Sequence, residues 1–576
     1  MDIISSLLDI INEPTIIFGD QDQFLSNYVA SSLPASWDLS PLNPKNRIES
    51  LDNSNCKWRI DGCARFGTQF YAIPTHVPDL VPIRIDVFIP SQDHHPFELR
   101  DALDSSYSLF VKGAEVANLG IAKHVCRALD YHSERDPEFW KTYQNLPFGS
   151  RILIDDITSN VKDMSLSFLP AHSLEKKLLS IKSLQRLWAS QVPPEGWPST
   201  IDISELRLLH QLHDSISLIN IPSHSSTEKY IFKSSTTDPK YLYHELLLLL
   251  TLPSHPNIIS KPLFLVTKKS SFGGKNGVCG FILPYHPIGS LRDILPSRAS
   301  TGTLTFKQQL KWSQQITSAI IHIREKSGTF YSDLRPDNVL LTPLKEGDGE
   351  DVILVDFEQR GNWREWCAPE VLYPIYLDQL RSQSVNLSPH WENILQSHPS
   401  ISIETTNENV GWTGKPTWLA LDPCEQENAE VYNLGLFLYC VFEGQCSVQK
   451  SLLNEWPYNP KVDFPEFRRT PEKLREIIRR CTIDSPEWNR EPEHKGGGYG
   501  GGVRRRGKVY PRRQYADSDV RKGIWDSARR WWEEELWMME TFLKDNSPSQ
   551  GREIRRPTLR EVLAFLESAE EIERLA

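Results

Sequence analysis

Two kinds of hydrophobic pattern follow each other along the first third of the chain. Apolar and polar residues alternate over Ile83–Ile89 (IRIDVFI), and a short apolar run stands at Arg151–Ile154 (RILI); both patterns are typical of strands. Leu174–Trp188 carries apolar residues at helical spacing. The stretch Val192–Ser199 (VPPEGWPS) is rich in Pro and Gly, which favours a linker. We therefore expect an α+β domain over residues 1–195, whose scattered carboxylates and histidines indicate no chemistry.

The pattern from about residue 203 onward indicates a second region. Asp238-Pro239 is a good helix start, and the apolar-rich Lys240–Leu252 that follows predicts a helix. Two stretches look inserted, a polar one at 381–425 and another at about 488–554. The second includes a glycine-rich segment from His494 that cannot pack a core, so we expect a mobile loop there.

Composition narrows the class of protein. The chain has 576 residues, 39% hydrophobic and 24% charged, which is ordinary for a globular protein and long enough for several domains. A net charge of −11 argues against a surface built wholly for nucleic acid. Nine cysteines without C-x-x-C spacing favour a reducing compartment over a disulfide scaffold or zinc site. The N-terminus has no basic n-region, and the longest apolar run, Leu246–Leu252, is far short of the ~20 residues that span a bilayer. We expect a cytoplasmic or nuclear protein without a membrane partner.

Three short motifs follow one another in the second region. Tyr331–Asn338 (YSDLRPDN) precedes one β-like run, Asp356-Phe357 follows the next, and Ala368–Glu370 (APE) comes after that. A lone D-x-x-x-x-N would arise by chance roughly once in a chain of this size. In this order and context, however, the motifs resemble the H-R-D-x-x-x-x-N, D-F-G and A-P-E motifs of protein kinases.

The resemblance implies a chemical role for each of these residues. Phosphoryl transfer needs a placed hydroxyl, a placed γ-phosphate and cations that neutralise charge. Asp333 matches the base that accepts the substrate hydroxyl proton, and Asn338 and Asp356 match the Mg²⁺ ligands. Arg335 replaces the catalytic-loop lysine and is still a cation able to reach the γ-phosphate of ATP.

The likeness extends upstream. Tyr230–Lys233 resembles V-A-I-K, so Lys233 would pair with the α- and β-phosphates of ATP. Glu245, on the helix before His255–Ile259 (HPNII), would be the partner of Lys233; the alternative is a side chain that faces water. Phe281–His286 resembles the hinge that holds adenine, with the candidate cofactor-binding residues Leu283, Pro284 and His286, joined by Leu218.

The likeness also extends downstream, to about residue 576. Glu430 stands where the family has an Asp that anchors the catalytic loop, which leaves an extra methylene to accommodate. Arg556, in an R-P-T motif, would form a buried ion pair with Glu370. The resemblance therefore implies a bilobal kinase fold, with an N-lobe over 203–286 and a C-lobe over 287–576.

Several departures from the family favour a pseudokinase. No glycine-rich loop precedes Lys233, because the matching region is Gln211–Leu218; Asp214 within it would repel the phosphates of ATP if it faced them. Ser332 replaces the arginine that grips an activation-loop phosphate, and Glu358–Cys367 has no Ser, Thr or Tyr. We therefore expect no switching by phosphorylation of this segment. Glu358, in place of a glycine, is a further metal ligand or a solvated side chain, and we favour the latter.

The motifs on either side of Glu358–Cys367 also resemble those of a divergent group of kinase-like proteins of filamentous fungi. We expect Mg²⁺- and ATP-dependent phosphorylation of Ser or Thr in a protein whose identity the sequence does not indicate. A pseudokinase scaffold and a small-molecule kinase stay open as alternatives. The stretch Lys495–Arg513 holds seven cations and no acid; we favour a solvated loop over a nuclear-localisation or nucleic-acid patch.

Overall fold

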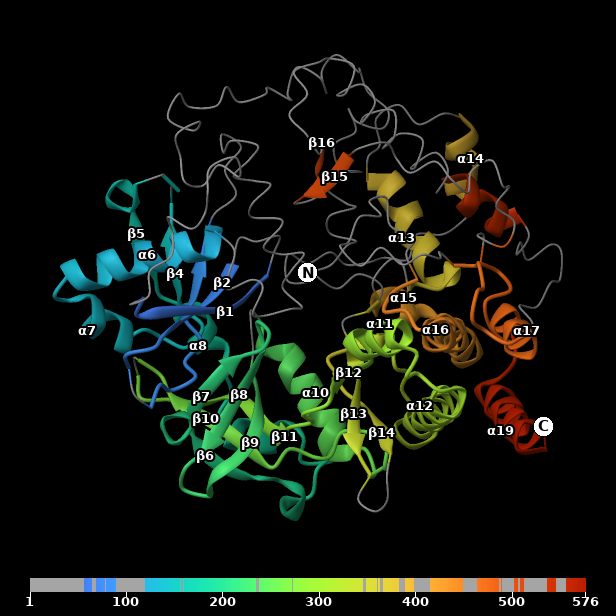
Figure 1. Cartoon of the computed structure of the whole chain (residues 1–576), viewed down its shortest axis with the longest axis horizontal. Helices are drawn as coiled ribbons and strands as arrows, with labels where there is room; N and C mark the ends of the chain where they lie inside the picture. Colours follow the sequence, from blue (N-terminus) through green and yellow to red (C-terminus); the bar gives the residue numbers. More distant parts are fainter. Residues whose placement is uncertain are drawn as a thin grey trace. The chain divides into compact units, whose positions relative to one another are not determined.

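The protein is an α+β protein whose contacts divide it into two compact units (Figure 1). In this computed structural model, unit 2 holds the described residues from Cys56 to Thr251 together with Ser260–Tyr285. Unit 1 holds Leu252–Ile259 and the described residues from His286 onward. The structure describes residues 56–64, 69–77, 79–89, 120–155, 157–158, 160–234, 238–271, 273–344, 349–359, 361–362, 366–382, 389–397, 415–448, 464–485, 488, 502–505, 508–511, 536–544 and 556–575.

Unit 2 contains a five-stranded sheet built from the first part of the chain. Its strands pair in the order β1-β2-β3-β4-β5, with only the β3–β4 pair parallel. Trp58 of the first strand shares a core with Val125 and Leu129 of α6, so the helix packs on this sheet. The elements are β1 (Trp58–Ala64), β2 (Gln69–Pro74), β3 (Asp86–Phe88), α6 (Gly120–Arg135), α7 (Phe139–Gln144), β4 (Arg151–Ile154), η4 (Val161–Asp163) and β5 (Leu166–Leu169).

The strand predicted at Arg151–Ile154 is confirmed as β4, whereas the one predicted at Ile83–Ile89 is shorter. Only Asp86–Phe88 forms β3. Arg84 has a φ of 56°, in the left-handed region, and an extended strand cannot continue through that conformation. The alternating pattern gave no sign of this backbone turn, nor of the burial of the polar residues Arg84 and Asp86.

A six-stranded sheet follows in the same unit. Its order is β6-β10-β11-β9-β8-β7, and only the β6–β10 pair is parallel. The predicted helix is present as α10, whose Tyr243 hydroxyl donates to the Val278 carbonyl of β11 at 2.8 Å. The elements are β6 (Ser199–Asp202), η6 (Ile203–Glu205), β7 (Arg207–Gln211), β8 (Ile216–Ile221), β9 (Ser225–Ser234), α10 (Pro239–Thr251), β10 (Phe264–Lys269) and β11 (Asn276–Pro284).

The expected domain boundary near residues 195–203 differs from the structure. Leu174 and Leu178 lie in the same hydrophobic core as Ile201 and Val266 of the six-stranded sheet. The single helix expected over Leu174–Trp188 is two short helices, because the Val278 N–H donates to the Leu179 carbonyl and holds the chain extended between them. The predicted linker is also packed, since Val192 is buried and β6 begins at the end of that stretch. The elements here are α8 (His172–Lys177), α9 (Ile181–Leu187) and η5 (Pro194–Gly196).

Unit 1 is mainly helical and is organised around α16. Every residue of this helix from Ala429 to Glu443 is buried, and α12, α17 and α19 pack against it. A three-stranded sheet, in the order β12-β13-β14, lies beside α12 in the same unit. The main elements are β12 (Gly289–Ser290), α11 (Leu291–Thr301), α12 (Phe306–Ser327), η7 (Pro336–Asn338), β13 (Val339–Pro343), β14 (Glu350–Leu354), α13 (Pro369–Ser382), α16 (Pro423–Glu443), α17 (Glu472–Cys481) and α19 (Leu559–Leu575).

The two stretches that look inserted contain regular structure. The first holds α14 (Pro389–Ser397) and α15 (Lys415–Ala420), and Trp418 of α15 is fully buried against Phe330. The end of that stretch is therefore part of the core. In the second, β15 (Gly502–Arg505) and β16 (Lys508–Pro511) form a hairpin where a loop was expected. The glycine-rich segment before the hairpin lies outside the described residues.

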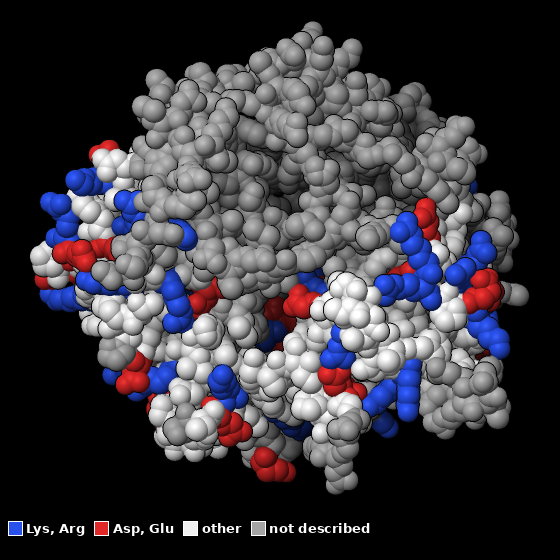
Figure 2. Space-filling view, in the orientation of Figure 1, with Lys and Arg blue, Asp and Glu red and all other residues white. Residues whose placement is uncertain are grey.

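The described surface carries both signs of charge. Lys and Arg side chains are mixed with Asp and Glu side chains over the described part of the face drawn in Figure 2. Among the described helices, none combines the length and apolar character needed to cross a membrane.

Candidate functional site

Two loops of unit 1 carry the residues that match the kinase motifs. The antiparallel β13–β14 pair places the segment before β13 next to the segment after β14. The Val355 N–H donates to the Asn338 carbonyl at 3.0 Å, and the Tyr331 hydroxyl donates to the Val355 carbonyl at 2.5 Å. These bonds hold the two loops together, so Asp333, Asn338 and Asp356 lie in one region of the unit.

Asp333 is fixed by its neighbours in the catalytic-loop motif. The Asn338 side-chain amide donates from Nδ2 to both the carbonyl oxygen and Oδ2 of Asp333, each at 2.9 Å. Arg335 donates from Nε to Oδ1 at 3.0 Å. Because Nδ2 of Asn338 faces Asp333, its Oδ1 is the atom that could bind a cation.

The surroundings of Asp333 in the protein favour the protonated form of its carboxyl group more than bulk water would. Burial raises the pKa of its carboxyl group, the charge of Asp356 raises it further, and Arg335 opposes both effects. The net result is a pKa above the ordinary value for Asp. A raised pKa brings a carboxylate closer to the strength that a general base needs at neutral pH.

Arg335 is already paired within its own loop. Its guanidinium lies 3.0 Å from Asp333 and 3.5 Å from Asp337, and Arg292 holds the other side of Asp337 at 2.8 Å. Burial alone would lower the pKa of Arg335, but the charges of Asp333 and Asp337 raise it, so the group stays ionised. That this cation also reaches the γ-phosphate of ATP remains a prediction.

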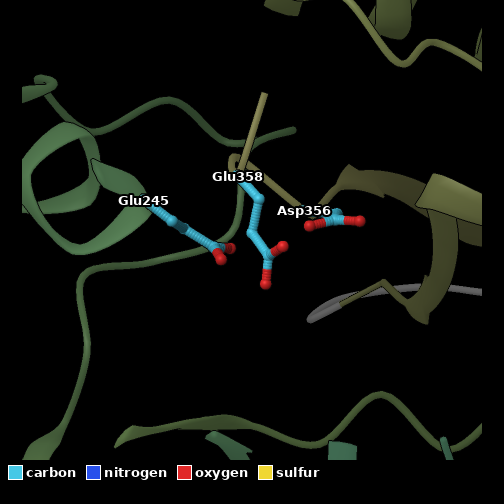
Figure 3. A group of neighbouring side chains, drawn as sticks. All are labelled: Glu245, Asp356 and Glu358. Carbon is cyan, nitrogen blue, oxygen red and sulfur yellow. The ribbon is translucent and has the colours of Figure 1, made fainter. Parts of the chain in front are cut away.

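Asp356 and Glu358 follow β14 in a strained segment of backbone (Figure 3). Asp356 has a φ of 66°, in the left-handed region that Asp tolerates better than most residues. A carboxylate oxygen of Asp356 lies within 4.8 Å of one of Glu358. Glu358 is only 8% exposed, so the favoured interpretation of a solvated side chain is wrong. Two neighbouring carboxylates are the hard oxygen donors that Mg²⁺ prefers.

Glu430 of α16 anchors the backbone of the loop that carries Asp333. Its Oε1 accepts the Tyr331 N–H at 2.9 Å, and its Oε2 accepts from Arg324 of α12 at 2.8 Å. The Glu430 side chain therefore links this loop to α12. Burial raises the pKa of Glu430 to about 7, although the Tyr331 N–H and Arg324 act in the opposite direction.

The predicted ion pair between Glu370 and Arg556 is present. Their closest approach is 2.5 Å, and Asp484 lies 3.5 Å from the same guanidinium. Arg556 also donates to the Asn428 carbonyl at 2.9 Å. This buried network ties the start of α13 to α16 and to the segment before α19.

In unit 2, Lys233 of β9 and Glu245 of α10 form the expected pair. The Lys233 ammonium lies 2.5 Å from the Glu245 carboxylate, and the two residues are 4% and 0% exposed. The alternative, a Glu245 side chain that faces water, is therefore wrong. Glu245 is the third residue that Figure 3 labels, and it extends from α10.

The candidate adenine-binding residues of unit 2 occupy one face of its six-stranded sheet. Leu218 of β8 and Leu283 of β11 are both register partners of Ile231, so the three form a row across the sheet. Lys233 stands two residues beyond Ile231 and thus on the same face. Pro284 ends β11, and His286 begins the described part of unit 1 that follows; their part in binding adenine remains a prediction.

Sequence reasoning missed the residue that anchors the short segment after Glu358. The Trp418 indole N–H donates to Asn362 Oδ1 at 2.9 Å, and the Trp418 ring stacks on Phe330 at a centroid distance of 4.7 Å. Both Asn362 and Trp418 are buried. The apolar residues around Trp418, within an otherwise polar stretch, were the available signal for this contact.

The functional assignment of this chain rests on the residues described above. No protein-family model matches the chain, and no curated protein matches it.

Proposed function

We propose that this chain transfers the γ-phosphoryl group of Mg²⁺-bound ATP to Ser or Thr hydroxyls of a protein substrate. The observation that carries the proposal is the arrangement around Asp333. Its side chain is 16% exposed, its carboxylate is held by Arg335 and Asn338, and the charge of Asp356 acts on it. Glu430 fixes the backbone of the same loop. Such a prepared carboxylate suits a general base.

The proposal assigns a role to each candidate residue. Lys233, held by Glu245, would bind the α- and β-phosphates, with Leu218 and Leu283 against the adenine. Asn338 and Asp356 would hold Mg²⁺, with Glu358 as a further oxygen donor. Bound Mg²⁺ supplies charge neutralisation on the phosphate oxygens. Asp333 would take the proton of the attacking hydroxyl.

The proposed enzyme needs no phosphate on its activation segment. The segment after Glu358 contains no Ser, Thr or Tyr, and Asn362 within it is already anchored by Trp418. The preference for Ser or Thr and the bilobal kinase fold belong to the same proposal. The same proposal includes a site of action in a reducing compartment, the cytosol or the nucleus, which nine cysteines without C-x-x-C spacing favour.

The test is transfer or release of the γ-phosphate from labelled ATP with Mg²⁺, compared with Asp333→Asn. We expect wild-type turnover that falls by a factor on the order of 10² to 10⁴ in the variant, because the variant lacks the base. Circular dichroism of both proteins controls for folding. Equal turnover by the two proteins would contradict the assignment of Asp333 as the base.

A second candidate is a binding module without catalysis, favoured by the turn between β7 and β8. This turn replaces the glycine-rich loop, and its Leu212 and His213 N–H groups both donate to the Ile216 carbonyl. A phosphate could not use those N–H groups without breaking the turn. Titration with Mg²⁺ and a fluorescent ATP analogue separates the candidates: no binding and no turnover would favour the binding module.

A further inference from the structure

The outer edge of β7 is covered by the five-stranded sheet of the same unit. β7 is the last strand of the six-stranded sheet, so its outward N–H and C=O groups need partners. The Leu208 N–H donates to the Leu80 carbonyl at 2.7 Å. Arg59 donates from Nη2 to the Leu209 carbonyl at 2.5 Å, and Asp61 Oδ2 accepts the Gln211 N–H at 2.8 Å.

Arg59 and Asp61 of β1 act together at this edge. Arg59 donates from Nε and Nη2 to the two oxygens of Asp61, at 2.7 and 3.3 Å. The Asp61 side chain is only 5% exposed, so its oxygens need these hydrogen-bond partners. These two residues, called the fork below, therefore bind one carbonyl and one N–H of β7, immediately before the turn that leads into β8.

That turn is closed by its own hydrogen bonds. The Gln211 side chain donates to the His213 carbonyl at 2.6 Å and accepts from the Ser217 hydroxyl at 2.9 Å. The Ile216 carbonyl accepts the Leu212 and His213 N–H groups at 2.8 and 3.0 Å. Glutamine and serine side chains here stabilise a single turn conformation, which a glycine-rich loop would not do.

Asp214 at the tip of the turn has its charge compensated within unit 2. Its carboxylate lies 2.5 Å from His213 Nδ1. Burial would raise its pKa, but His213 and then Arg84, in the segment before β3, hold that pKa well below its ordinary value. The positive charge of Arg84 therefore reduces the repulsion of phosphates expected from Asp214.

We infer that Arg59 and Asp61 are positioning residues for the nucleotide, because they hold the turn over residues 211–217 in one conformation. The five-stranded sheet is then an integral part of the nucleotide-binding unit. This inference rests on the proposed function for its effect on ATP, whereas its effect on the turn is independent of any activity. Loss of the fork should weaken binding of Mg²⁺-bound ATP more than it slows phosphoryl transfer.

Hydrogen exchange of the full chain tests the turn directly. We expect Asp61→Ala to speed exchange of the 207–217 amides by about tenfold or more, because it removes a charge-assisted bond from Gln211 and the partner of Arg59. Asp61→Asn keeps an oxygen for the Gln211 N–H and should restore part of the protection. Asp79→Asn is the matched control, since the Asp79 carboxylate pairs with the Arg207 side chain of β7, at 3.4 Å, and its own side chain is 77% exposed.

Steady-state kinetics of the same variants test the positioning role. For Asp61→Ala we expect the KM for ATP to rise several-fold while kcat stays within about twofold, with Asp79→Asn like the wild type. Unchanged exchange at 207–217, or a fall in kcat without a rise in KM, overturns the inference. A third outcome is that Asp61→Ala speeds exchange but the wild-type protein binds no Mg²⁺-bound ATP. That result overturns the proposed function and the nucleotide role of Arg59 and Asp61, which then only support the turn. If Asp61→Ala does not fold, Asp61→Asn and Arg59→Lys carry the same comparison.

Discussion

At the scale of single residues, Glu430 couples the catalytic loop to pH. Burial raises its folded-state pKa from 4.5 to about 7, so the native protein keeps a proton that the unfolded chain releases between these two pH values. The free energy of unfolding therefore falls as pH rises from about 4.5 to 7, by roughly 3 kcal/mol at most, and this contribution is then constant.

Glu430→Gln should remove that pH dependence, since the amide does not titrate but can still accept the Tyr331 N–H. Urea unfolding of wild type and variant at pH 5 and pH 7.5 measures the difference. The wild type should lose stability relative to the variant between the two pH values. Parallel losses in both proteins would contradict an unusual titration of Glu430.

Asp333 makes a second prediction at this scale, on catalysis. Its pKa is raised by burial and by Asp356, and Arg335 is the charge that lowers it. In Arg335→Ala we expect the acidic limb of the kcat–pH profile to move to higher pH, since the charge that favours the ionised form of Asp333 is gone. Arg335→Lys keeps the charge, so its acidic limb should lie between those of the wild type and Arg335→Ala. Identical acidic limbs in all three proteins would show that Arg335 does not change the pKa of Asp333.

At the scale of elements, α15 holds the short segment after Glu358 through Trp418. Trp418→Phe keeps a ring against Phe330 but loses the N–H that binds Asn362. We expect faster protease cleavage within residues 357–368 and a modest loss of stability, about 1 kcal/mol. Trp418→Ala also empties a buried site and should cost about 3 to 5 kcal/mol in urea unfolding. Equal cleavage of wild type and Trp418→Phe would argue against an anchored segment.

The elements also show what the sequence could and could not predict. Local patterns were sufficient for β4 and for α10, because each depends on a short-range pattern, whereas the pairing of Lys233 with Glu245 was expected from the resemblance to protein kinases. The break between α8 and α9 depends on a bond from Val278, some hundred residues away, which no local pattern contains. The burial of Trp418 likewise depends on Phe330, from a distant part of the chain.

At the scale of the whole molecule, the expected separation of residues 1–195 from the kinase-like region is the main difference between pattern and structure. Two kinds of contact join them within unit 2: apolar side chains of α8 and the segment after it, and polar side chains of β1. Leu174 and Leu178 belong to the core of the six-stranded sheet, whereas Arg59 and Asp61 bind the edge of β7. Truncation can remove the polar contacts of β1 and keep the apolar contacts of Leu174 and Leu178.

Two truncated chains give the last prediction. A chain that begins at residue 196 loses Leu174 and Leu178 as well as the β1 contacts, so it should fail to show a cooperative thermal unfolding transition, since burial of each leucine is worth about 1.5–3 kcal/mol. A chain that begins at residue 170 keeps both leucines and should unfold cooperatively, but at a lower temperature than the full chain. Its β7 edge lacks Arg59 and Asp61, and we expect its 207–217 amides to exchange as fast as those of Asp61→Ala. If the chain from residue 196 unfolds as cooperatively as the chain from residue 170, then α8 contributes little to the six-stranded sheet, and the boundary expected from the sequence would be the physical one.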